Sequence, residues 1–154
     1  MKARSQRSAT DSTSPAQQAS DALAAYCPDL DQWPRSWRYE ERDVPPGEKI
    51  VEYFTPFLRH LLHSNLSRTT LRKHRDNLWA LGGEIISRLH ETPTLRKQPM
   101  ANVVFAALGD DGGPLLSHHQ SEEEQRSFDS TCRKFWRFLK DTKDKPPARP
   151  AAKK

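Results

Sequence analysis

The sequence contains few cysteines, no long apolar run and no catalytic signature, and each absence excludes a class of protein. Cys27 and Cys132 are its only cysteines, and they lack the CxxC or Cys/His spacing of a metal site. Neither a disulfide framework nor a zinc site is indicated, so we expect reduced thiols in a cytoplasmic protein. No apolar run approaches the roughly 18 residues of a membrane span, and residues 1–20 lack the apolar centre of a secretory signal.

Motifs that mark common enzyme classes are also missing. The sequence has no GxSxG, HExxH, P-loop or GxGxxG pattern. His118–His119 falls in an expected loop and His60 shares an expected helix with His63, but neither pair has a third metal ligand close by in the sequence. Glu84 is a single carboxylate without a partner or a base. We therefore predict a protein that is not an enzyme and uses no metal and no cofactor.

A low hydrophobic content limits how much of the chain can enter a core. Only 34% of the 154 residues are hydrophobic, and the mean hydropathy is −0.90. One domain with polar ends fits these values. We expect a disordered arm over residues 1–46, a helical domain over residues 47–141 and a basic disordered tail over residues 142–154. The arm carries an aromatic segment at residues 33–39, which we expect to pack onto the domain.

Apolar residues recur at helical spacing in four segments, which cover residues 48–64, 68–90, 99–108 and 122–140. The predicted fold class is therefore all-α, a small four-helix bundle. The sequence VPPG at residues 44–47 is expected to break the chain before the first of these helices.

Local signals predict where several helices begin, bend or end. Ser67 is a suitable N-cap, and Ser121 with Glu124 has the spacing of a capping box. Gly109 is expected to cap the third helix. Pro56 lies inside the first helix, where it is expected to cause a kink or a restart.

The phases of the second and fourth helices predict a core that includes Leu78, Ile85, Phe135 and Leu139. The pair Gly82–Gly83 lies in the middle of the second helix, where two glycines cost about 2 kcal/mol of helix propensity. The close approach of another helix is the expected compensation.

Cations cluster on two of the expected helices. The second helix carries Arg68, Arg72, Lys73 and Arg75 in its first two turns, and the fourth carries Arg133, Lys134 and Arg137. The helix dipole favours anions at an N-terminus, so the first group gains nothing from it. A polyanion docked there would explain these cations, whereas the alternative is an ordinary solvated face. The net charge of +5 does not by itself distinguish the two.

The order of these segments resembles a known family. Residues 53–62, then LSRTTLRKHRDNLWALGGEI, then STCRKFWRFLKD, are similar to the core-binding domain of tyrosine recombinases of the phage-integrase type. In that family an LS-x-x-T-x-x-x-Y/H-x-x-x-L helix and a final R-x-F-x-x-F-L helix frame a four-helix, SAM-like domain that clamps the DNA major groove. The residues that carry the resemblance are Leu66, Ser67, Thr70, His74 and Leu78 in the first pattern, and Arg133, Phe135, Phe138 and Leu139 in the second.

Departures from the family concern its chemistry. No nucleophilic tyrosine can be placed, because Tyr26, Tyr39 and Tyr53 all precede the second helix. The loop over residues 93–120 is also long for the family. The resemblance therefore implies DNA binding without recombination.

The resemblance and the cation clusters together predict a non-catalytic DNA-binding module, accessory to a mobile element, with double-stranded DNA as its partner. The expected contacts are Arg68, Thr69, Arg72, Lys73, Arg75, Arg133, Lys134 and Arg137. The alternative is a protein-interaction or homodimerisation module with no nucleic-acid role. Its interface would use Trp33, Trp37 and Tyr39 of the aromatic segment, or Trp79 and Trp136.

Overall fold

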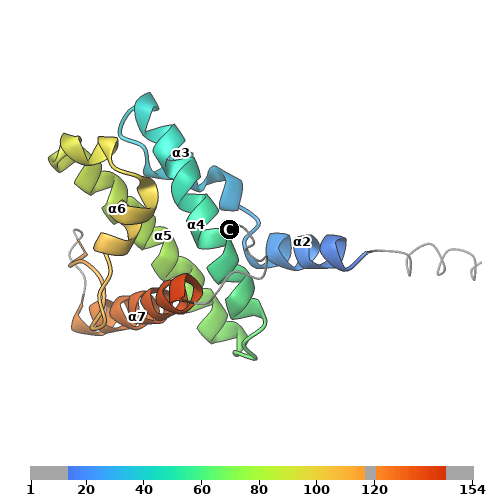
Figure 1. Ribbon diagram of the computed structural model, residues 1–154. Helices are drawn as coiled ribbons and strands as arrows, with labels where there is room; N and C mark the ends of the chain where they lie inside the picture. The colour runs from blue at the N-terminus through green and yellow to red at the C-terminus, as the bar shows by residue number, and fades with distance from the viewer. Residues whose placement is uncertain (1–13, 117–120, 145–154) are drawn as a thin grey trace, which may run out of the picture.

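The computed structural model describes residues 14–116 and 121–144, and within these ranges the chain is helical without any strand (Figure 1). The α-helices are α2 (Pro15–Tyr26), α3 (Trp33–Trp37), α4 (Val44–Leu62), α5 (Arg68–Glu91), α6 (Met100–Ala106) and α7 (Glu122–Asp144). Short 3-10 turns cover Leu30–Gln32, Glu41–Asp43 and Pro93–Lys97. The predicted all-α class is confirmed, with two α-helices more than the four expected. The SAM-like arrangement stays a prediction.

The segment expected to break the chain instead begins α4. Val44 to Gly47 form its first turn, and prolines are tolerated there because the first amides of a helix have no intrahelical partner. Of the kink or restart expected at Pro56, the restart is wrong, since α4 continues through that residue. Thr55 does not cap a new helix but donates its hydroxyl to the Val51 carbonyl at 2.8 Å.

The predicted caps of α5 and α7 are confirmed. Ser67 Oγ accepts the Thr70 amide at 3.1 Å. Ser121 Oγ accepts the Glu124 amide at 3.1 Å, and the Glu124 carboxylate accepts the Ser121 amide at 3.1 Å. The cap predicted at Gly109 is wrong, because α6 ends earlier.

Helix α6 has its C-cap at Ala107. Gly109 instead exchanges backbone hydrogen bonds with Gly112, at 2.9 Å and 3.3 Å, which closes the tight turn before Gly113. The boundary expected between the domain and its C-terminal tail, at residue 142, is also wrong, because α7 continues to Asp144. Residues 145–154 lie outside the described ranges.

Three helices meet around an aromatic centre. The ring of Phe135 on α7 packs against Phe54 and Phe57 of α4, with centroid distances of 5.4 Å and 4.8 Å. Leu78 and Ile85 of α5 are fully buried beside them, as predicted. Leu139 is only partly buried at the edge of this core, so its predicted full burial is wrong.

The N-terminal arm predicted to be disordered is folded over residues 14–46. Trp33 and Trp37 are 2% and 5% exposed, so the aromatic segment packs into the core as expected. Leu23 and Tyr26 of α2 are buried as well, although α2 projects from the side of the bundle (Figure 1). The polar composition of this segment gave no sign of these elements, because α2 buries only Leu23 and Tyr26 and shows no continuous apolar stripe. Residues 1–13 lie outside the described ranges.

The glycine pair in α5 accommodates Trp37. A Cβ atom added to Gly82 would lie 2.0 Å from the indole ring, so no larger residue fits. The indole Nε1 donates to the Trp79 carbonyl at 2.9 Å. The expected close approach is confirmed, and it is made by an aromatic side chain of α3.

No helix in the described ranges combines the length and apolarity that crossing a bilayer requires.

Candidate functional site

The first candidate site lies where α7 crosses the N-terminal half of α5 (Figure 1). His74 Nδ1 lies 2.7 Å from Thr131 Oγ1, and Asn77 Nδ2 donates to the same hydroxyl at 2.9 Å. Further along α7, the ring of Phe138 packs on His60 near the end of α4, with centroids 4.9 Å apart. The first half of α7 therefore packs on α5 at His74 and Asn77, and its second half lies beside the end of α4.

His74 helps to hold this crossing and is not one of its cations. It is 6% exposed, and burial together with the nearby Lys134 ammonium lowers its pKa below the ordinary histidine value. A neutral imidazole bonded to Thr131 ties α5 to α7 without adding charge.

Most of the residues predicted to contact DNA are exposed. On α5 these are Arg68, Thr69, Arg72 and Lys73, and on α7 the exposed residue is Arg137. Within the described ranges none of these four cations forms an ion pair. Arg59, which sequence reasoning missed, is exposed in the last turn of α4 and adds a cation at the same end.

Three of the predicted contacts have intramolecular surroundings instead. Arg75 is 3.1 Å from the Asp76 carboxylate and donates to the Tyr26 carbonyl at 3.1 Å, which ties the end of α2 to α5. Arg133 is partly buried and donates to the Asp111 carbonyl at 3.4 Å. Lys134 is partly buried beside His74. These side chains are less available to a ligand than the exposed group.

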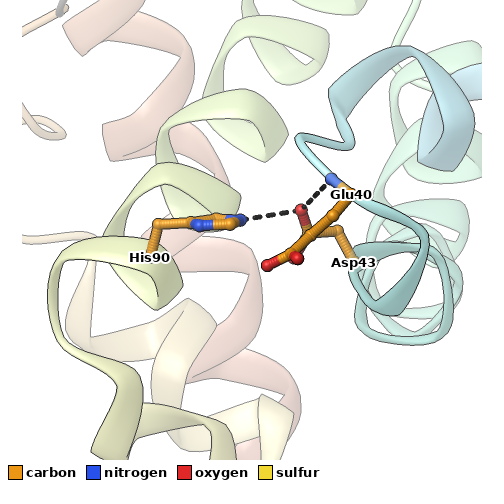
Figure 2. Close-up of side chains that lie close together, drawn as sticks. All are labelled: Glu40, Asp43 and His90. Carbon is orange, nitrogen blue, oxygen red and sulfur yellow. Dashed lines mark hydrogen bonds and ion pairs between the residues drawn. The ribbon is translucent and has the colours of Figure 1, made fainter.

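A second polar cluster surrounds Asp43, whose side chain is fully buried. Its Oδ2 atom accepts the amides of Tyr39 and Glu40 at 2.8 Å and 3.0 Å and lies 2.8 Å from His90 Nε2 (Figure 2). Its Oδ1 atom accepts Arg96 at 2.8 Å. Burial alone would raise the pKa of Asp43, but the hydrogen bonds from His90, Arg96 and the two amides outweigh it and hold that pKa well below the ordinary value.

Oxygen and nitrogen atoms of Glu40, Asp43 and His90 lie within 4.8 Å of one another, close enough to surround a metal ion (Figure 2). The electrostatics oppose that use. The Arg96 guanidinium already neutralises Asp43, and both lone-pair directions of Oδ2 are occupied by donors. The cluster is a structural clamp that joins the turn before α4 to the end of α5. Sequence reasoning missed it because its members come from three separate segments.

The other candidate groups identified in the sequence have ordinary surroundings. His63 Nδ1 lies 2.8 Å from the Arg59 carbonyl, and the ring of His60 stacks on Phe57. Cys27 and Cys132 are free and buried, and burial raises the pKa of Cys27 to about 12. The pair at residues 118–119 lies outside the described ranges.

The aromatic residues proposed for a protein interface divide into two groups. Trp33 and Trp37 are core residues and cannot contact a partner. Tyr39 and Trp79 are 66% and 44% exposed, while Trp136 is partly buried with the Lys140 ammonium 5.3 Å from its ring centre. Only Tyr39 and Trp79 therefore offer a substantial aromatic surface to a partner.

Comparisons with known proteins add no relative whose role could be carried over to these residues. No family model, no curated protein and no solved structure matches the chain. The role of each residue therefore rests on its own chemistry and surroundings.

Proposed function

We propose that this protein is a non-catalytic, cytoplasmic DNA-binding module that holds duplex DNA at its basic end. The basic end comprises the exposed residues Arg68, Thr69, Arg72 and Lys73 of α5, and Arg137 of α7. The observation that supports the proposal is that α7 packs across the N-terminal half of α5, and that the exposed cations of the basic end, Arg68, Arg72, Lys73 and Arg137, have no ion-pair partner in the described ranges.

Phosphate is the ligand that suits this arrangement. The amides of Arg68 and Thr69 precede the first intrahelical hydrogen bond of α5, and the positive end of the helix dipole lies there too. Placing cations against that dipole is unfavourable in isolation, whereas a phosphate is attracted by the amides, the dipole and the side chains together. Arg68 and Arg72 can each bind a phosphate in a bidentate manner.

The same two helices carry the resemblance to the core-binding domain of tyrosine recombinases. The LS-x-x-T pattern spans the N-cap and first turn of α5, α7 contains the R-x-F-x-x-F-L pattern, and the two helices are packed together. The proposal therefore includes a role accessory to recombination, in which this chain contacts DNA and contributes no nucleophile.

Titration of the protein against random-sequence duplex at two salt concentrations tests the proposal. We expect a Kd of about 1–100 µM near physiological salt, with binding that strengthens steeply at low salt. The double substitution Arg72→Glu and Lys73→Glu should weaken binding at least tenfold and reduce the salt slope by about two units, because two phosphate contacts become repulsive.

A matched control separates local from global charge. Lys49→Glu with Lys97→Glu changes the net charge equally, and both lysines are exposed near the opposite end of the bundle, where α4 begins and α5 ends. This variant should bind within about threefold of the unaltered protein. Equal losses in both variants, or no binding tighter than about 1 mM at low salt, would exclude a DNA site at the basic end.

A further inference from the structure

A groove of about 1290 Å³ runs along α5 between the aromatic segment and the start of α7, and of the residues that line it only Lys73 belongs to the basic end. Its floor is formed by Lys73, Asp76, Asn77, Ala80, Gly83 and Glu84. From Lys73 to Glu84 the helix rises about 16 Å, which is three turns. Ala80 has only a methyl side chain, so a second backbone can approach the middle of the floor closely, and next to it Gly83 is covered by the Trp37 ring.

One wall of the groove is aromatic. Trp79 is 44% exposed, and its ring is held in place because Nε1 donates to Ser36 Oγ at 2.9 Å. Tyr39 is 66% exposed and rests on His90, with ring centroids 4.5 Å apart. Behind them Trp37 forms a rigid base. Two fixed and exposed aromatic rings on one side of a groove are typical of surfaces that bind an apolar partner.

The opposite wall is acidic. It is formed by Glu123, Glu124 and Ser127 in the first turns of α7, together with Leu116 of the preceding loop. Glu124 is used in the capping box, but Glu123 is exposed and has no ion pair in the part of the chain that the structure describes.

Five acidic and three basic side chains line the whole groove, and one of the basic ones, Arg75, already pairs with Asp76. The surroundings therefore carry a net negative charge, which repels a phosphate backbone and attracts cations.

We propose that this groove docks a basic amphipathic helix of a partner protein, at a site separate from the DNA-binding end. An apolar stripe on the partner would lie against Trp79 and Tyr39, and lysines or arginines on its adjacent face would pair with Glu123 and Glu124. Three turns of helix match the length of the floor.

The acidic wall lies at the start of α7, and Asp144 at the end of that helix is about 32 Å away, at 1.5 Å per residue. A separate partner is therefore the occupant that we propose, and the basic residues after Asp144 are the alternative occupant.

Fluorescence anisotropy with a labelled peptide of about 14 residues, composed of Lys and Leu at amphipathic helical spacing, tests the proposal on the full chain. We expect saturable binding in the micromolar range, and none for the same peptide with Glu in place of Lys. Glu123→Lys should weaken binding by roughly fivefold or more, because an attractive pair becomes repulsive.

Glu122→Lys is the matched control. Glu122 lies in the same first turn, so the charge and helix-dipole effects are equal, but it does not line the groove and pairs with Arg126. It should bind the peptide like the unaltered protein, and circular dichroism should show both variants folded. Equal binding by the two variants, or equal binding of the Lys and Glu peptides, overturns the proposal.

Two further measurements distinguish the other occupants. If replacing the Lys and Arg residues of 145–154 by Gln raises peptide affinity severalfold, the tail occupies the groove and the separate partner is rejected. The variant Arg68→Glu with Arg72→Glu, which changes no residue of the groove, should retain peptide binding, while Glu123→Lys should retain duplex binding. Loss of both ligands in both variants would instead indicate one shared polyelectrolyte surface and reject a separate peptide site.

Discussion

Asp43 shows how single residues hold the N-terminal segment in place. Its carboxylate is buried and receives hydrogen bonds from two amides, His90 and Arg96. Such a charge is costly to bury alone, and each donor offsets part of that cost. The four contacts join the turn before α4 to the last turn of α5 and to the 3-10 turn that follows, so the residue determines where three segments meet.

The substitution Asp43→Asn should destabilise the fold by about 3 kcal/mol, because His90 and Arg96 lose a charged partner in a buried site. Thermal or urea denaturation at neutral pH measures the loss. Glu41→Gln is the control, since Glu41 is exposed and takes part only in long surface ion pairs at 3.6 Å and 3.9 Å. Comparable losses in the two variants would contradict the role assigned to Asp43.

The same carboxylate predicts a pH dependence. Its folded-state pKa lies below the ordinary value of 3.8, so the stabilisation is present above about pH 4 and is lost as the pH falls through the folded-state pKa. The unfolding free energy measured from about pH 5 down to about pH 2 should therefore fall more steeply in the unaltered protein than in Asp43→Asn. If the two proteins instead lose stability in parallel as the pH falls, the pKa of Asp43 is not lowered by folding.

At the scale of elements, α7 has two faces with separate tasks. One face buries Phe128, Cys132 and Phe135 against the core, and the bonds at Thr131 fix its crossing with α5. The outer face keeps Arg137 exposed. Because the crossing depends on the buried face, the position of the cations at the basic end follows from core packing.

The two apolar residues predicted for the core of α7 should therefore differ in their effect. Phe135→Ala removes a fully buried ring that contacts Phe54 and Phe57, and should cost about 3–5 kcal/mol. Leu139→Ala should cost less than about 2 kcal/mol, since Leu139 is only partly buried. Chemical denaturation of both variants checks the ranking, and a larger loss for Leu139→Ala would mean that the phase of α7 is wrong.

At the scale of the whole molecule, the folded unit begins well before the boundary that composition indicates. Trp33 and Trp37 belong to the same core as α4 and α5, and Trp37 lies directly over Gly82. Two buried indoles contribute on the order of 5–10 kcal/mol by area, which is comparable with the total stability of a small domain.

A fragment of residues 47–144 should therefore be unfolded or barely stable, whereas residues 14–144 should melt cooperatively. Circular dichroism during heating compares the two fragments directly. If the shorter fragment melts at the same temperature as the longer one, α2 and α3 are attachments to the bundle and not parts of its core.

The helices themselves could be predicted from the sequence because their signals are short-range. Apolar spacing gave α5 and α7 nearly to their ends, and Ser67 and Ser121 cap them through groups only three residues away. Two predictions failed where the local pattern misled. The polar residues around Leu23 and Trp33 indicated disorder, although these segments are stabilised by docking onto the core. The prolines of Val44–Gly47 indicated a break, although prolines are compatible with the first turn of a helix.

Sequence alone therefore determined the all-α class, most helix positions and the identity of the clustered cations. Tertiary structure decided which cations are free, because Arg75 is bound to the Tyr26 carbonyl 49 residues away while Arg72 is exposed. It also decided the crossing at His74 and Thr131, 57 residues apart, and the burial of Asp43. Capping and periodicity act within one helical turn, whereas these contacts depend on how separate helices pack, which no local pattern records.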